Sequence, residues 1–315
     1  MTALHALILT LICIVWGFHF TVIKVAVAEV PPIAYVAVRM FIVALLLVPF
    51  LKWHRGMMRR ILVAGVCFGG LNYVFMFSGV KYTSASVGAL FVETYVPLAT
   101  IMSVIFLGEK IRWRRMLGLA LAFSGVVVVA TAGEEGTGSS NLALGGSLLL
   151  AAALCEAFGA ITVKRIEGVK PLQLLAWFGI IGTLVTTPMS LAIERDQLSV
   201  LTSDARGVAL AALLYSVIMV SIVGHASYYW LLQRVDVSQV AGGTVMTTLF
   251  AVTFGVLLLD EPLTWQLIVG GIVTLAGVAI IVARSGAKQA QAMATVSEAL
   301  GQDVGAETQH EKDRT

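Results

Sequence analysis

The sequence predicts an all-α integral membrane protein in which ten transmembrane helices form two inverted five-helix repeats. Three observations lead to this prediction: an apolar composition, ten long apolar runs, and similarity between the two halves of the chain. Hydrophobic residues make up 58% of the chain and charged residues 12%. Soluble domains average roughly 45–50% apolar and about 25% charged residues. This chain therefore lacks the charge to cover a water-exposed surface, whereas a lipid-facing surface needs none.

Ten apolar runs are long enough to be transmembrane helices, because about 20 apolar residues cross the hydrocarbon core. They are continuous rather than alternating, which favours helices over the strands of a membrane barrel. The first begins near Met1 without a basic region before it, so we interpret it as a retained span rather than a signal peptide. The runs cover residues 4–28, 33–51, 61–80, 84–107, 116–132, 144–163, 172–193, 207–232, 237–259 and 263–283.

The segment 133–141 is rich in Gly and Ser and lies near the middle of the chain. Such a composition is typical of a loop. It predicts a boundary between a first five-helix unit, 1–135, and a second, 136–284. Residues 285–315 are polar and contain no long apolar run. We expect them to form a disordered cytoplasmic tail.

Lys and Arg residues are distributed unequally between the two sides of the predicted bundle. If the N-terminus is cytoplasmic, the cytoplasmic side holds 14 of them and the other side at most four. Positive residues concentrate in cytoplasmic loops, so both termini are predicted to be cytoplasmic and the number of spans to be even. The four residues on the other side are Lys24, Lys81, Arg195 and Arg206.

Part of the chain repeats at an offset of 152 residues. The fourth and fifth runs resemble the ninth and tenth, and both copies contain Glu-x-x-x-Trp, two residue types that are scarce here. The matches are Ser86 with Ser238, Ala89 with Ala241, Glu109 with Glu261, Trp113 with Trp265, Gly118 with Gly270, and Gly125 with Gly277. A weaker match at an offset of 140 pairs Phe18 with Phe158 and Lys24 with Lys164.

An odd number of spans in each half inserts the second half into the membrane upside down. Inverted repeats are typical of secondary transporters, which bind substrate near the midplane and expose it alternately to the two sides. The repeat therefore favours a transporter of small solutes that works by alternating access.

The order of motifs resembles the EamA-type family of drug/metabolite transporters over residues 1–284. The resemblance depends on Trp16-Gly17-Phe18-His19-Phe20 with Lys24, on Pro31-Pro32 followed by Arg39, and on Leu107-Gly108-Glu109 and Leu259-Asp260-Glu261. It implies export of amino-acid-like solutes or related small metabolites across the bacterial inner membrane. Import, exchange or uniport of another solute, such as a drug, a nucleoside or a sugar, stays open.

Two acidic residues inside the apolar runs, Glu93 and Glu156, are candidates for binding substrate and carrying protons. A charge at a helix centre costs about 2.5–3.5 kcal/mol on insertion scales, so it is a functional candidate by default. Glu93 and Thr94 precede Pro97, which removes a backbone hydrogen bond and frees a carbonyl. The resemblance implies uncharged residues at both acidic positions, so Glu93 and Glu156 depart from the family pattern.

The alternative for both carboxylates is a structural ion pair. Glu93 would pair with Arg39 or Lys24. Glu156 would pair with Lys164, two turns further along its helix, or with a residue of another helix. Lys24 and Arg39 lie towards span ends, where long basic side chains reach the headgroups. For both we favour a structural or gating role over substrate contact.

Histidines and aromatic residues complete the predicted site. His19 and His225 lie mid-span, and histidine titrates near neutral pH, so His225 is a third candidate for proton coupling. Pockets are mainly apolar with a few placed polar groups. Packing between helices is the alternative for every one of these residues. The remaining expected substrate contacts are Trp16, Phe20, Asn72, Tyr73 and Tyr228.

Glu109 and Glu261 end the fourth and ninth runs, and we expect them to cap or latch gates on opposite faces. The chain contains neither His-Glu-x-x-His nor a Gly-rich phosphate loop, which argues against a membrane-embedded enzyme. We expect no metal, no cofactor and no nucleic acid. The expected partners are a small-molecule substrate and the lipid bilayer, with the chain as a monomer or a homodimer.

Overall fold

The computed structural model describes residues 2–108, 113–197, 204–232 and 243–282, and among these residues it contains helices and no strand. In the first half the helices are α1 (Ala3–Glu29), α2 (Pro32–Leu47), η1 (Val48–Phe50), α3 (Met58–Ala64), η2 (Gly65–Leu71), α4 (Asn72–Tyr82), α5 (Ala85–Val92), α6 (Tyr95–Leu107) and α7 (Trp113–Ala130). Short helix α8 (Gly133–Thr137) lies within the predicted linker.

In the second half the helices are α9 (Leu142–Val163), α10 (Pro171–Ile193), α11 (Arg206–Leu214), η4 (Tyr215–Gly224), α12 (His225–Leu232), α14 (Met246–Leu259) and a last helix, Trp265–Val282. Among the described residues, nine helical segments are long and apolar enough to cross a membrane. The shorter α14 is the described part of the ninth predicted span. The prediction of ten spans is confirmed.

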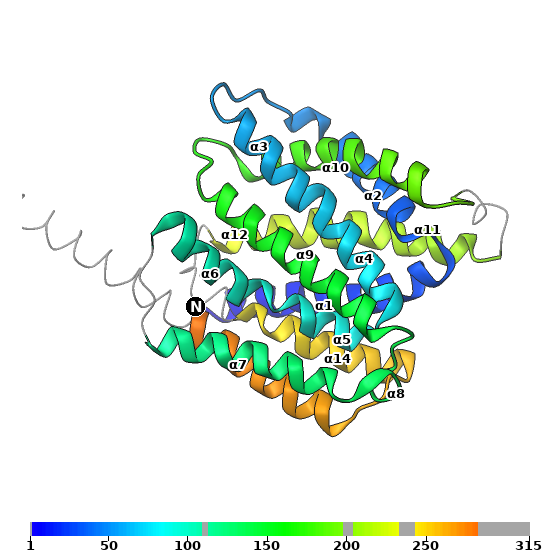
Figure 1. The fold of residues 1–315 in the computed structure, drawn as a ribbon. Coiled ribbons are helices and arrows are strands. Elements are labelled where there is room, and N and C mark those ends of the chain that lie inside the picture. Colours follow the sequence, from blue (N-terminus) through cyan, green and yellow to red (C-terminus); the bar gives the residue numbers. More distant parts are fainter. Residues whose placement is uncertain (1, 109–112, 198–203, 233–242, 283–315) are drawn as a thin grey trace, which may run out of the picture.

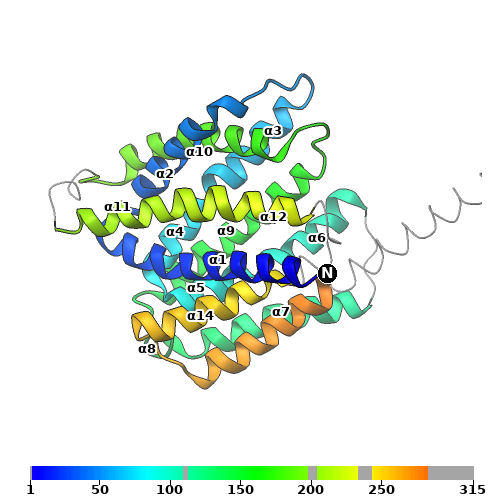
Figure 2. The same cartoon turned by 180° about the vertical axis from the view of Figure 1, so that it is seen from behind.

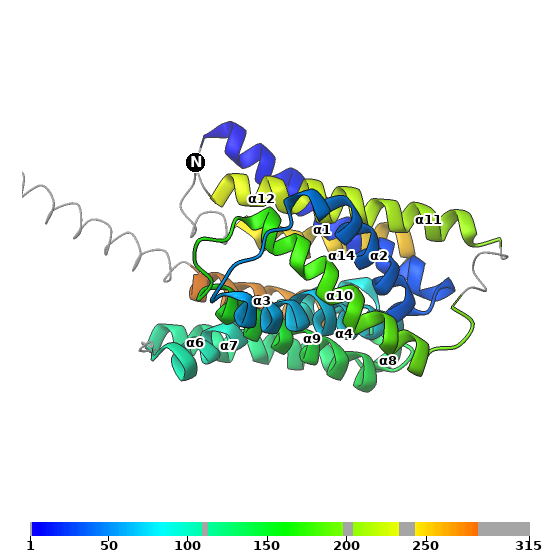
Figure 3. The same ribbon diagram turned by 90° about the horizontal axis from the view of Figure 1, so that it is seen from above.

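The helices run roughly parallel to one another and form a bundle one helix long (Figures 1 and 2). One end holds the connections at residues 51–57 and 164–170, and we call it the basic end. The opposite end holds α8 and residues 83–84, 194–197 and 260–264, and we call it the α8 end. Seen from above, α1 and α12 lie on one side of the bundle and α6 and α7 on the other (Figure 3).

The two halves pack against each other through matching pairs of helices. α1 packs against α14, and its counterpart α9 packs against α5 and α6. α4 packs against α9, and α1 in turn packs against η4, α11 and α12. α2 packs against α10, and α7 packs against the last helix. In each of these two pairs, the two helices are each other's counterparts in the repeat. Exchanging the two halves maps these pairs onto one another, as an inverted repeat requires.

Glycines on α7 and the last helix show this symmetry most directly. A Cβ atom at Gly118 would meet the carbonyl of Gly277, and one at Gly125 would meet the carbonyl of Gly270. The repeat pairs Gly118 with Gly270 and Gly125 with Gly277. Each contact is thus the two-fold image of the other, as at a self-complementary interface. Small residues allow such close approach between membrane helices.

The main apolar core lies between α1, α4, α5 and α9. It includes Ile23, Phe77, Leu90 and Leu149, which are all buried. Apolar side chains elsewhere are exposed around the bundle, as in α2, α7 and the last helix. This distribution fits a protein whose outer surface contacts lipid rather than water.

Candidate functional site

Irregular helix geometry occurs at matching places in the two repeats. The π-helical segment η2 interrupts the third span, and η4 interrupts the eighth. The fourth span is broken between α5 and α6 at Glu93 and Thr94, and α14 begins after a turn at Val245. Val245 lies 152 residues after Glu93, which is the repeat offset. π-Segments often mark functional sites, and broken helices near the midplane form transporter binding sites.

Glu93 lies at the break in the fourth span. Pro97 has no backbone N–H to offer the Glu93 carbonyl, which instead accepts from Val96 N at 3.2 Å. The carboxylate points to the other repeat, where its Oε1 accepts from Thr248 Oγ1 at 2.7 Å. The side chain is half-buried. The proline thus terminates α5 and places a carboxylate where the two halves meet.

Glu156 projects from α9 towards the third span. Its Oε2 accepts from Asn72 Nδ2 at 3.3 Å, and the same amide donates to the carbonyl of Ala152 at 2.9 Å. The charges of Glu93 and Glu156 lie close enough to act on each other. Neither carboxylate forms an ion pair within the described part of the chain. Lys164 is exposed at the end of α9, so the structure shows none of the alternative ion pairs.

Aromatic side chains flank the two carboxylates. The Trp16 ring lies 5.3 Å from the ring of His225 and 5.4 Å from that of Tyr228. Tyr228 and Tyr95 both lie within the electrostatic reach of Glu156. His225 Nδ1 donates to the carbonyl of Val220 at 2.8 Å, across the end of η4. This group combines apolar faces with polar edges, the composition of a small-molecule pocket.

A second polar cluster connects α1, α2 and η4. Ser216 Oγ is hydrogen-bonded to His19 Nε2 at 3.0 Å and to the Tyr35 hydroxyl at 2.8 Å. Arg39 Nη2 donates to Ser221 Oγ at 3.1 Å, and that hydroxyl donates to the carbonyl of Ser216 at 3.0 Å. The π-helical backbone makes this last bond possible, because it places residue i beside the carbonyl of residue i−5.

Arg39 is fully buried in this cluster, with an exposure of 0%. Its guanidinium lies over the Tyr73 ring, with Cζ 4.6 Å from the ring centroid. We expected a structural role for Arg39, and the described residues supply no carboxylate partner for it. Tyr73 follows Asn72 on α4, so one turn of that helix contacts both Glu156 and the guanidinium.

Phe20 belongs to the main apolar core rather than to the central cluster. Thr94 is buried, and its hydroxyl donates to the carbonyl of Phe91 at 2.6 Å, within the broken segment. Glu109 lies outside the described residues.

Five residues of the site were not predicted from the sequence: Ser216, Ser221, Thr248, Tyr35 and Tyr95. A single hydroxyl residue in an apolar run does not by itself indicate a binding site. Only their positions beside the π-segment, the helix break and the buried charges make them part of the site.

At the α8 end, Lys24 and Glu261 hold the turn between α4 and α5 from two sides. Lys24 Nζ donates to the carbonyls of Val80, Lys81 and Thr83, near the C-terminus of α4. The Glu261 carboxylate accepts from the backbone N–H groups of Ala85 and Ser86 and from the Ser86 hydroxyl. Each charge has the sign that the nearby helix end favours.

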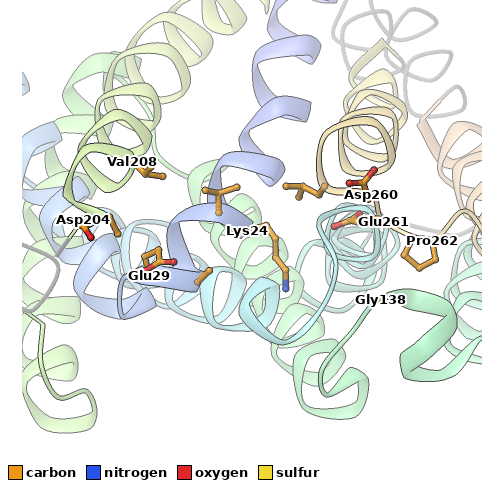
Figure 4. Close-up of a pocket in the computed structure, with 12 residues that line it drawn as sticks. Lys24, Glu29, Gly138, Asp204, Val208, Asp260, Glu261 and Pro262 are labelled. Carbon is orange, nitrogen blue, oxygen red and sulfur yellow. The ribbon is translucent and has the colours of Figure 1, made fainter.

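These two side chains also line an open pocket of about 750 Å³ at the α8 end (Figure 4). Three further acidic residues line it, from the end of α1, the turn before α11 and the residue after α14: Glu29, Asp204 and Asp260. Among the described residues, no three His, Cys, Asp or Glu side chains gather in a way that would hold a metal ion.

A sequence model of the EamA-like transporter family matches residues 4–131 and 143–283. The chain belongs to the EamA-like transporter family. The two matches cover the two sets of helices that pack symmetrically here. The expected family is thus confirmed, and the chain is a multi-pass membrane protein of a transporter family.

Relatives with curated names are similar over almost the whole helical region. A "Probable amino-acid metabolite efflux pump" of Salmonella typhimurium is 27% identical over 86% of this chain and 92% of its own. A protein of the same name in Escherichia coli is 26% identical over the same shares. An "Uncharacterized transporter" of Archaeoglobus fulgidus is 26% identical over 88% of this chain and 97% of its own.

A protein of known crystal structure has the same fold, with a TM-score of 0.61 and 18% identity over 90% of this chain and 99% of that one.

Proposed function

We propose that this chain exports amino acids or related small metabolites across the bacterial inner membrane by alternating access, coupled to protons. One observation carries the proposal. Two partly buried carboxylates, Glu93 and Glu156, one from each repeat, lie within electrostatic reach of each other, and neither has a cation partner among the residues that the structure describes. A buried carboxylate can be neutralised by a proton or by a substrate ammonium group. Competition between the two would couple proton entry to substrate exit.

Three further observations support it. The efflux-pump names of two relatives point in the same direction. The aromatic faces of Trp16 and Tyr228 beside the carboxylates suit a small solute with both apolar and polar parts. The excess of Lys and Arg at the basic end supports an orientation with both termini in the cytoplasm.

The test uses purified full-length protein in liposomes that contain radiolabelled L-leucine, L-phenylalanine or L-serine. We expect an imposed pH gradient to accelerate efflux of at least one of them. Glu93→Gln or Glu156→Gln should abolish this acceleration, because the amide keeps the size of the side chain and cannot take up the proton. Glu135→Gln is the matched control, since Glu135 is exposed on α8, far from the site.

The outcomes separate the parts of the proposal. If no amino acid moves, the proposed substrate class is wrong. If the efflux rate of the wild type does not depend on the pH gradient, the proposed coupling to protons is wrong. If both Gln variants keep the gradient dependence of the wild type, the carboxylates are not the coupling groups.

A further inference from the structure

Arg39 carries a positive charge that the described residues leave without a counter-charge. The side chain is fully buried, and within the described part of the chain its Nε and Nη1 atoms have no hydrogen-bond partner. Its remaining nitrogen, Nη2, donates to the neutral hydroxyl of Ser221. Buried arginines are normally paired with carboxylates, because an uncompensated buried charge is strongly destabilising.

The aromatic contacts of Arg39 compensate the charge only in part. The guanidinium lies 4.6 Å from the Tyr73 centroid and 5.8 Å from that of Phe77. Cation–π attraction acts on the face of the guanidinium and leaves its N–H groups unsatisfied. One of the two unpartnered nitrogens, together with the second N–H of Nη2, forms the planar donor fork that matches the two oxygens of a carboxylate.

The surroundings connect Arg39 to the two carboxylates. Its charge acts on His19 and on His225, and His225 lies against Trp16. Trp16 packs on Tyr228, which lies within the field of Glu156. One continuous set of side chains therefore contains a buried cation at one side and two carboxylates at the other.

We propose that Arg39 binds the carboxylate of a zwitterionic substrate while Glu93 or Glu156 binds its ammonium group. The proposal rests on the proposed function and specifies how the substrate would be recognised. Two carboxylates in the same site repel a dianion, so the arrangement favours a monoanionic carboxylate over a phosphate. The aromatic side chains around the two charged groups would contact the side chain of the substrate.

The first test needs only the wild-type chain, purified in detergent. L-Leucine, L-phenylalanine and L-serine are each compared with their carboxamide, which lacks the negative charge, and with the corresponding carboxylic acid without the amino group. Calorimetry or ligand-induced thermal stabilisation reports binding. For at least one amino acid we expect the zwitterion to bind about 10- to 100-fold more tightly than its carboxamide, because charged hydrogen bonds to Arg39 are lost.

The second test assigns this difference to Arg39. Arg39→Gln should bind the amino acid and its carboxamide equally, and Arg39→Lys should keep part of the preference, since it keeps the charge without the planar fork. Arg114→Gln is the matched control: Arg114 also lies over an aromatic ring, that of Trp113 at 5.3 Å, but it is exposed. It should keep the wild-type preference.

Every outcome of these two tests either supports or overturns the proposed role of Arg39. Equal binding of amino acids and carboxamides by the wild type overturns the proposal, whether or not the variants fold. An unchanged preference in a folded Arg39→Gln variant also overturns it and leaves Arg39 as a packing residue. If carboxylic acids without an amino group bind through Arg39 while no amino acid is transported, the anion site stands and the proposed substrate class falls. If no carboxylate binds at all, the anion site falls as well.

Discussion

At the scale of residues, the charges of the central site do not follow the repeat. The offset of 152 pairs Glu93 with the apolar Val245, and the offset of 140 pairs Glu156 with Trp16. A symmetric set of helices therefore carries an asymmetric set of charges. No residue of the other half stands in for either carboxylate, so each can be substituted singly in a meaningful test.

Ser216 should matter for stability, because it serves two buried partners at once. Ser216→Ala would leave both His19 Nε2 and the Tyr35 hydroxyl without this hydrogen bond, at a cost of about 1–3 kcal/mol. We expect a lower apparent Tm in detergent. Ser147→Ala is the control, because Ser147 is exposed and donates only to its own helix, at the carbonyl of Leu144. Equal Tm values for the two variants would contradict the buried network.

The buried charges could be predicted from the sequence, because a charged residue in an apolar run is costly and therefore stands out. The groups that they contact could not be predicted. An ion pair with Glu93 was the alternative for Arg39, whereas the structure places its guanidinium beside Ser221 and Tyr73. Side-chain partners depend on how distant helices rotate against one another, and hydropathy does not contain that information.

At the scale of elements, the break between α5 and α6 should be required for transport rather than for stability. Pro97→Ala would supply an N–H to the Glu93 carbonyl, and in a helix interior alanine is favoured over proline by about 3 kcal/mol. We expect an unchanged or higher Tm and a transport rate about tenfold lower, equivalent to roughly 1.4 kcal/mol in the barrier. Pro188→Ala, inside α10, is the matched control and should transport normally. Normal transport by Pro97→Ala would show that the break is dispensable.

Glu261 should stabilise the α8 end through its bonds to the first turn of α5. Glu261→Gln keeps the shape but weakens charge-assisted bonds to Ala85 and Ser86, at a cost of about 1–3 kcal/mol. Asp260→Asn is the control. The side chain of Asp260 is exposed, and its backbone lies in the left-handed region with φ +52°, a conformation that asparagine tolerates. We expect Glu261→Gln to lower the Tm and Asp260→Asn to leave it unchanged. A similar loss of Tm in both variants would show that Glu261 does not specifically cap the N-terminus of α5.

Hydropathy predicted the spans within a few residues of the observed helices but not their interruptions. Pro97 indicated the break in the fourth span. Its counterpart at Val245 has no proline, and nothing in the residues of η2 or η4 marks a π-segment. Such distortions arise from the fit between neighbouring helices, so they were found only in the structure.

At the scale of the whole molecule, the repeat was predictable because close helix contacts strictly limit residue size at a few matching positions. Gly118, Gly125, Gly270 and Gly277 lie where two helices touch backbone to backbone. Any larger residue there would separate the two halves. The same glycines were visible in the sequence as matches at one offset, so the inverted architecture could be predicted from a few scarce positions.

Orientation in the membrane is the whole-molecule property that loop charge predicts. Positive residues stay on the cytoplasmic side, so the basic end should face the cytoplasm and α8 the periplasm. The test uses a variant in which Cys13, Cys67 and Cys155 are replaced by alanine, with one cysteine returned at either Arg55 or Glu135. Both positions are exposed, one at each end.

In intact cells, a membrane-impermeant maleimide should label Glu135→Cys and spare Arg55→Cys until the membrane is permeabilised. Thr2→Cys, beside the first turn of α1, should behave as Arg55→Cys does, because the N-terminus lies at the basic end. The opposite pattern would place both termini outside and reverse the direction that export requires. Labelling of both Arg55→Cys and Glu135→Cys in intact cells would indicate dual insertion, and the charge difference between the two ends would then not determine orientation.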